Sequence, residues 1–170
     1  MLSATGDYGV TLYDRDEASL ARAIRPSLRS QSLTVETATA LATALRGNDI
    51  VVNAGPYHLT PQIAAAAKEI GAHYFDLTED VESTRTVRRL AEGAATAFVP
   101  QCGLAPGFVS IVANHLASRF DPLRDLIMRV GALPLYPTNA LGYNLTWSTE
   151  GLINEYLNPC EAIVDGREVA

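Results

Sequence analysis

Short runs of β-branched and apolar residues alternate along this chain with longer stretches rich in Ala and Leu. The runs expected to form strands are residues 10–13, 33–36, 50–53, 73–76 and 97–100. Several are apolar throughout, as is typical of parallel strands that helices cover on both faces. The alternation predicts strand–helix–strand units and therefore an α/β protein built on a parallel sheet.

Local end signals place the helices between these strands. Thr60 is expected to cap a helix that has Pro61 in its first turn, and Gly71 suits the left-handed residue that follows its end. Asp16 is the expected cap of an earlier helix, and apolar spacing predicts another over residues 39–46.

The last part of the chain follows a different pattern, which begins at Leu123. A buried helix over residues 108–115 is expected to lead out of the first domain. Further elements are expected at residues 126–130, 143–147 and 162–164 as strands and at residues 150–157 as a helix. The sequence thus predicts a dinucleotide-type domain over residues 1–118 and part of a second α/β domain over residues 119–170.

Charge and composition narrow the class of partner. The chain has 13 Lys and Arg against 19 Asp and Glu, so its net charge of −6 disfavours nucleic acid. With 48% apolar residues the chain can bury a hydrophobic core without disulfide bonds or structural metals. The uncharged stretch 93–118 is interrupted by prolines and glycines, so no membrane span is expected. Two cysteines and an N-terminal segment unlike a signal peptide favour a cytoplasmic protein.

Asp14 ends the first expected strand. Dinucleotide-binding folds place a carboxylate there to accept hydrogen bonds from the adenine ribose, and Asp14 is the candidate for this role. The alternative is a local cap, for which Asp16 is better placed. Arg15 could meet a 2′-phosphate, so the pattern leaves NAD and NADP open as cofactors.

The glycine fingerprint that should precede this carboxylate by about twenty residues is missing, because Gly6 and Gly9 do not fit it. We therefore expect a truncated chain whose Rossmann-type sheet lacks its first strand and glycine-rich turn. That strand would lie centrally, between the strands that end at Asp14 and Asn53. Its absence would expose two sheet edges, which predicts self-association. The missing glycine-rich turn predicts weak cofactor binding.

The segment after the strand at residues 50–53 carries the next candidates. Asn53, Ala54 and Gly55 come at the carboxyl edge, where open α/β sheets bind their ligands, and Tyr57 could face the substrate with a proton-donating hydroxyl. The alternative is a plain turn. His58 is expected to face solvent.

Residues that follow two further expected strands are also candidates. Asp76 and Leu77 are candidate cofactor contacts. The acidic residues that follow, Glu79 and Asp80, could bind a substrate ammonium group, but the favoured interpretation is that they begin the next helix. Cys102 and Gly103 follow the next strand. Cys102 could be a functional thiol, although a small buried cysteine is the favoured interpretation. No His, Cys or Asp spacing indicates a metal site.

Five segments in this order resemble the saccharopine dehydrogenase-like oxidoreductases: VTLYD, VVNAGPYHLTP, HYFDLTED, PQCGLAPG and YNLTWSTEG. The resemblance implies a Rossmann domain that binds NAD or NADP and a second α/β domain that closes over an amino-acid substrate and forms a dimer interface. It further implies that Tyr143 and Trp147 line the substrate side, and that Tyr57 and Cys102 lie at the catalytic junction.

Ala105 and Val130 stand where the glutamate-forming reductases of this family have Asp and Cys, so the pattern is more similar to the L-lysine 6-dehydrogenase branch. The implied reaction is hydride transfer from an amine-bearing carbon to the nicotinamide, followed by imine hydrolysis. The alternative is a catalytically inactive remnant that serves as a binding or assembly module.

Overall fold

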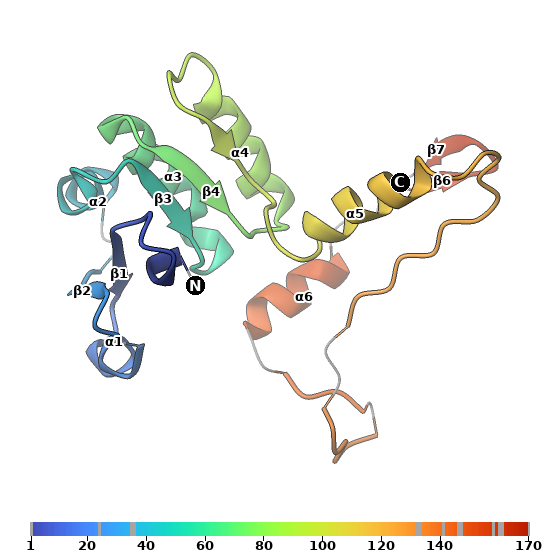
Figure 1. Cartoon of the computed structure of the whole chain (residues 1–170), viewed down its shortest axis with the longest axis horizontal. Coiled ribbons are helices and arrows are strands. Elements are labelled where there is room, and N and C mark those ends of the chain that lie inside the picture. The colour runs from blue at the N-terminus through green and yellow to red at the C-terminus, as the bar shows by residue number, and fades with distance from the viewer. Residues whose placement is uncertain are drawn as a thin grey trace.

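The computed structural model describes residues 2–23, 25–34, 37–131, 134–140, 142–145, 148–157, 159 and 162–169 (Figure 1). In chain order the N-terminal elements are η1 (Leu2–Ala4), β1 (Val10–Asp14), α1 (Glu17–Ala23), β2 (Leu28–Ser32), α2 (Ala38–Leu45), β3 (Ile50–Asn53), η2 (Tyr57–Leu59), α3 (Thr60–Ile70), β4 (His73–Asp76), α4 (Val81–Ala91) and β5 (Phe98–Val99). The remaining elements are α5 (Phe108–Ala117), α6 (Thr149–Leu157), β6 (Ala162–Val164) and β7 (Arg167–Val169).

The strands of the N-terminal half form two parallel sheets. β1 pairs with β2, and β3, β4 and β5 form a second sheet in that order. The predicted α/β class with parallel strands is therefore confirmed. Among the described residues no ladder joins β1 to β3, so the sheet is interrupted between the strands ending at Asp14 and Asn53, as expected.

The second strand lies earlier than the sequence indicates. It is Leu28–Ser32, which pairs with Val10–Asp14. The prediction of a strand at residues 33–36 is therefore wrong for residues 33 and 34, and residues 35 and 36 lie outside the described part of the chain. Its sequence, LRSQS, is polar and mostly exposed, so only the pairing with β1 reveals it. An edge strand of this kind carries little apolar signal.

A core of apolar side chains lies between the second sheet and helices α2, α3 and α4. Its largest fully buried members are Tyr74 and Val87, and alanines of α3 let that helix approach closely. Gly71 ends α3 with a φ of +72°, as predicted. Thr60 is not the cap of α3: it is the first helical residue and is fully buried, because its hydroxyl is used inside the fold.

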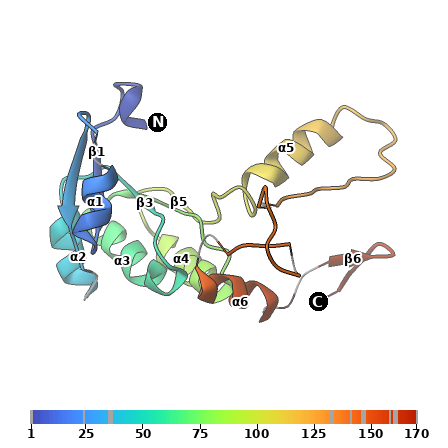
Figure 2. The same ribbon diagram turned by 90° about the horizontal axis from the view of Figure 1, so that it is seen from below.

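The C-terminal part departs from expectation. Figures 1 and 2 show α5 and β6–β7 projecting away from the N-terminal sheets. α5 forms where predicted but is not buried, because nothing described packs on its outer side: Phe108 and Ile111 are both exposed and only Ala113 is buried. Every helix within the described residues is too short or too polar to cross a bilayer.

Two of the later strands are not observed. Residues 126–130 form no strand, because no described segment supplies a hydrogen-bonded partner, and residues 143–145 are irregular, while 146 and 147 lie outside the described residues. The strand predicted at 162–164 is confirmed as β6, paired antiparallel with β7. The intervening Asp165 and Gly166 have φ values of 50° and 76°, the geometry of a tight hairpin turn.

Candidate functional site

The carboxyl ends of β3, β4 and β5 lie at one edge of the second sheet, which we call the rim. Asn53 and Asp76 are partners in the ladder between β3 and β4. The backbone N–H of Cys102 donates to the carbonyl of Asp76 at 2.8 Å, and that of Gln101 donates to Asp76 Oδ1 at 3.0 Å. The fold therefore brings together three of the predicted site residues, Asn53, Asp76 and Cys102.

Asn53 organises the turn that follows β3. Its buried side chain accepts a hydrogen bond from the N–H of Gly55 at 2.9 Å and donates Nδ2 to Thr60 Oγ1 at 3.1 Å and to Tyr74 Oη at 3.2 Å. A Cβ on Gly55 would lie 3.2 Å from Asn53 Oδ1, so a side chain there would crowd this bond. Because the Asn53 amide is occupied by the fold, the exposed backbone of Ala54 and Gly55 is what this turn offers a ligand.

Asp76 is a fully buried carboxylate at the centre of the rim. Its Oδ1 accepts hydrogen bonds from the N–H groups of Thr78 and Gln101, while Oδ2 has no partner among the described residues. Burial raises the pKa of the neighbouring Tyr74 phenol, and the negative charge of Asp76 raises it further. Tyr74 therefore stays protonated, and its hydroxyl oxygen accepts the hydrogen bond that holds the side-chain amide of Asn53.

Cys102 is exposed, so the favoured interpretation of a small buried cysteine is wrong. The turn directs its side chain outward, and Sγ donates to the carbonyl of Val99 at 3.3 Å. Partial burial raises the pKa of this thiol, and the charge of Asp76 adds to the effect, so the group is a thiol and not a thiolate at neutral pH. Leu77, at the same rim, is also exposed.

The loop after Cys102 is tightly folded. The carbonyl of Gly103 accepts from the N–H of Phe108 at 2.9 Å, and a Cβ on Gly103 would lie 3.3 Å from the carbonyl oxygen of Pro106. Gly107 has a φ of +129°, and a Cβ there would lie 2.5 Å from the Gly103 carbonyl oxygen. Glycine is required at this position because the chain passes too close for a side chain.

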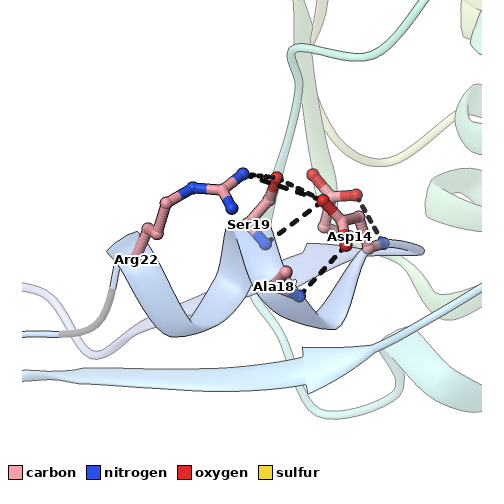
Figure 3. Close-up of polar contacts among 5 residues, drawn as sticks. Asp14, Ala18, Ser19 and Arg22 are labelled. Carbon is pink, nitrogen blue, oxygen red and sulfur yellow. Dashed lines mark hydrogen bonds and ion pairs between the residues drawn. The ribbon is translucent and has the colours of Figure 1, made fainter.

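Asp14 and Arg15 lie at the exposed end of β1, in the other sheet. Asp14 Oδ1 accepts from the N–H of Asp16 at 2.9 Å, which closes a local turn. Asp16 caps α1 by accepting from the N–H groups of Ala18 and Ser19, as predicted (Figure 3). A hydrogen bond from the Ser19 hydroxyl, followed by the Ala18 amide, lowers the pKa of Asp16. The structure shows the local role of Asp14, and its ribose contact stays a prediction.

Tyr57 is half-buried in the η2 turn beside the rim. Its carbonyl accepts from Ser83 Oγ at 3.1 Å, so the turn is fixed to the start of α4. Asp80 caps α4 by accepting from the N–H of Ser83 at 2.7 Å, which confirms that the acidic run starts a helix. His58 is exposed, as predicted.

Helix α6 lies against η2 and the start of α4, a contact that the sequence did not predict. Asn154 Nδ2 donates to Asp80 Oδ1 at 3.0 Å, and Glu150 Oε2 is 4.0 Å from His58 Nδ1. Burial raises the pKa of Glu79 to about 7, and the hydrogen bond and charge of Glu155 raise it as well. Contacts between residues some seventy positions apart leave no signal in a single sequence.

The remaining predicted substrate residues lie elsewhere or outside the described residues. Tyr143 is half-buried in a turn in which Asn139 Nδ2 donates to its carbonyl at 2.7 Å. Its substrate role stays a prediction. Trp147 lies outside the described residues. Within the described part of the chain, no three His, Cys, Asp or Glu residues are grouped so that they could hold a metal ion.

Comparison with known proteins decides the family. Residues 1–99 match the saccharopine dehydrogenase NADP binding domain, and residues 103–170 match the saccharopine dehydrogenase C-terminal domain. The chain belongs to the saccharopine dehydrogenase family. The predicted family resemblance is confirmed, and the match to the NADP-binding domain covers both parallel sheets with Asn53 and Asp76, while Cys102 lies between the two matched ranges.

Relatives within the saccharopine dehydrogenase family are longer than this chain. The L-glutamate-forming, NADP(+)-dependent saccharopine dehydrogenase of Saccharomyces cerevisiae is 25% identical over 98% of the chain, which spans 39% of that protein. The mitochondrial alpha-aminoadipic semialdehyde synthase of Mus musculus is 23% identical over 81% of the chain, or 16% of its own length. A structure of the apo yeast enzyme has a TM-score of 0.65 over 99% of the chain, with 24% identity, and shows the same fold.

Proposed function

We propose that this chain takes part in NAD(P)-dependent oxidoreduction of an amino acid, with the rim holding the nicotinamide end of the cofactor. The observation that carries the proposal is the meeting of Asn53 and Asp76, which end β3 and β4, with Cys102 in the segment after β5. Ligands of open α/β sheets bind at such carboxyl edges. Membership of the saccharopine dehydrogenase family supports this class of reaction.

The rim fits the ribose and nicotinamide because its backbone is accessible. Ala54 and Gly55 are exposed, Leu77 is exposed, and Gly103 has no side chain, so a flat ring and a ribose can approach the main chain. Asp14 would accept hydrogen bonds from the adenine ribose, and Arg15 would meet a 2′-phosphate if the cofactor is NADP. The sequence has no glycine fingerprint for the pyrophosphate, so binding by the chain alone is expected to be weak.

The substrate is proposed to be an amino acid similar to lysine. A bound nicotinamide would supply the acceptor for a hydride from the amine-bearing carbon. Tyr57 lies beside the rim and supplies a hydroxyl for proton transfer or orientation. The protonated thiol of Cys102 can donate a hydrogen bond, whereas its raised pKa disfavours a nucleophilic role at neutral pH. Tyr143 and Trp147 are proposed to line the substrate side.

Titration of the ¹⁵N-labelled chain with NADP⁺ and NAD⁺, followed by amide shifts, tests the rim. We expect shifts confined to residues 14–15, 53–55, 76–77 and 101–103 and a dissociation constant of roughly 1 mM. Gly55→Val should abolish them, because the new side chain meets Asn53 Oδ1. Gly9→Val, at an open position before β1, is the matched control and should leave them unchanged. Shifts at another surface, or shifts that survive Gly55→Val, would contradict the proposal.

One observation favours a second function, that of an assembly module without catalysis. The chain exposes an unusual set of large apolar side chains on α5 and on residues 126–130. Exposed apolar patches mark interaction surfaces. Association that is independent of nucleotide, in a chain whose rim shows no shifts with either cofactor, would favour this alternative.

A further inference from the structure

Helix α6 contacts the start of α4, although the two helices lie in different domains of the chain (Figure 2). Asp80 and α4 fall within residues 1–99, which match the NADP binding domain, and α6 falls within residues 103–170, which match the C-terminal domain. Asn154 of α6 donates Nδ2 to Asp80 Oδ1 at 3.0 Å. This hydrogen bond therefore joins the second domain to the first at a place beside the rim.

Further hydrogen bonds lead from this contact to the turn that carries Tyr57. The second carboxylate oxygen of Asp80 accepts from the N–H of Ser83 at 2.7 Å, and Ser83 Oγ donates to the carbonyl of Tyr57 at 3.1 Å. Partial burial opposes the ionisation of Asp80, but the hydrogen bonds from Ser83 and Asn154 outweigh it and lower the pKa of this carboxyl. Asn154, Asp80 and Ser83 thus form a continuous path from α6 to Tyr57.

Two carboxyl groups lie beside this path. Glu79 precedes Asp80 and Glu155 follows Asn154, so the two glutamates, which we call the glutamate pair, flank the hydrogen bond between the domains. Burial raises the pKa of Glu79 to about 7, and the hydrogen bond and charge of Glu155 raise it as well. A hydrogen bond between two carboxyl groups needs one proton, because two carboxylates offer only acceptors and repel each other. The contact is therefore complete only when the glutamate pair holds a proton.

The other charged groups on the elements packed here have partners of their own. His58 Nδ1 of η2 lies 4.0 Å from Glu150 Oε2 of α6, and Glu82 of α4 pairs with Arg85 at 2.6 Å. Within the described part of the chain, no Lys, Arg or His side chain lies at ion-pair distance from the glutamate pair. A shared proton is therefore what offsets the repulsion between its two carboxyl groups.

We propose that Asn154 is a positioning residue: through it α6 fixes the turn that carries Tyr57, and this contact is strongest while the glutamate pair shares a proton. Because Tyr57 acts on substrate only under the proposed function, the role of Asn154 rests on that function as well. The docked state holds the proton more tightly than the released state. Docking is therefore strongest below a pH of about 4.5 and weakens as the pH rises through about 7.

Amide hydrogen exchange of the whole chain, without nucleotide, measures the docking of α6. A helix of nine residues is marginal in water by itself, so protection of its amides from exchange reports the docked state. The reference protein and all variants carry His58→Gln, because histidine side chains titrate between roughly pH 5 and 8. We expect the protection factor of α6, corrected for intrinsic rates, to fall roughly three- to tenfold between about pH 6 and about pH 8.

Glu79→Gln and Glu155→Gln test the shared proton. Each replaces one carboxyl by an amide, which donates to the remaining carboxylate at any pH. Each should therefore hold the protection factor constant to within about twofold over this pH range. Glu82→Gln is the matched control, because it removes the same charge from a nearby exposed carboxyl whose partner is Arg85. It should leave the pH response of the reference protein unchanged.

Asn154→Ala tests the path from α6 to Tyr57. Loss of its hydrogen bond to Asp80 should lower the protection factor of α6 about fivefold. In ¹H–¹⁵N spectra of the reference protein, the amide signals of Tyr57 and Ser83 should move as the pH rises. Asn154→Ala should move the same signals in the same direction at about pH 6, whereas Glu79→Gln should abolish their movement with pH.

Three results would overturn the proposal. The first is a reference protein in which α6 is unprotected or equally protected at both pH values, and the second is a pH response that survives in both Glu79→Gln and Glu155→Gln. The third is a set of Tyr57 and Ser83 signals that do not follow the docking of α6. All of these measurements are made without nucleotide, so failure of the proposed function is detected separately, by the titration with NADP⁺ and NAD⁺.

Discussion

Asn53→Ala is expected to be the most informative single substitution in the N-terminal domain. The amide of Asn53 makes hydrogen bonds to Gly55, Thr60 and Tyr74, and Asn53, Thr60 and Tyr74 are all buried. Each hydrogen bond contributes about 1 kcal/mol net, and a buried hydroxyl left without its donor costs about as much again. We therefore expect Asn53→Ala to lower the free energy of unfolding by about 3–5 kcal/mol.

Urea denaturation followed by circular dichroism, at one fixed protein concentration, measures this loss. Tyr74→Phe removes only one of the three bonds and should cost about 1 kcal/mol. Because the two residues share a hydrogen bond, the double variant should be less destabilised than the sum of the two, by about 1 kcal/mol. A loss below about 0.5 kcal/mol for Asn53→Ala, or strict additivity, would refute the view that this amide holds the turn together.

Two further substitutions test other parts of the structure. The pKa of Glu79 is raised from 4.5 to about 7, so the folded state holds its proton more tightly and stability should fall as the pH rises from about 4.5 through about 7. Since Glu79 is only half-buried, solvent screens part of this effect and we expect a fall of about 1 kcal/mol, measured by urea denaturation at several pH values. Glu79→Gln should remove it. Gly107→Ala should cost about 2 kcal/mol or more, because the Cβ would lie 2.5 Å from the Gly103 carbonyl oxygen. Gly131→Ala, in open space, should not, and equal denaturation midpoints for the two would contradict the reading of a tight loop.

Features that depend on a few neighbouring residues could be predicted from the sequence. Five strands, β1, β3, β4, β5 and β6, lie where the sequence indicates, and Asp16 and Gly71 perform their predicted end-of-helix roles. The meeting of Asn53 with Asp76 also follows, because parallel strands joined by helices end at the same edge. The sequence alone thus determined the α/β class, the family resemblance and the composition of the rim.

What depends on distant surfaces was decided only by the tertiary structure. The polar strand β2 exists because β1 pairs with it, and α6 contacts the loop before α4 through Asn154 and Asp80. Thr60 serves Asn53 and not the helix end, Cys102 faces outward, and α5 is uncovered although its sequence is apolar. Burial and hydrogen bonding across the fold depend on which surfaces meet, and periodicity within one segment carries no information about the surface opposite it.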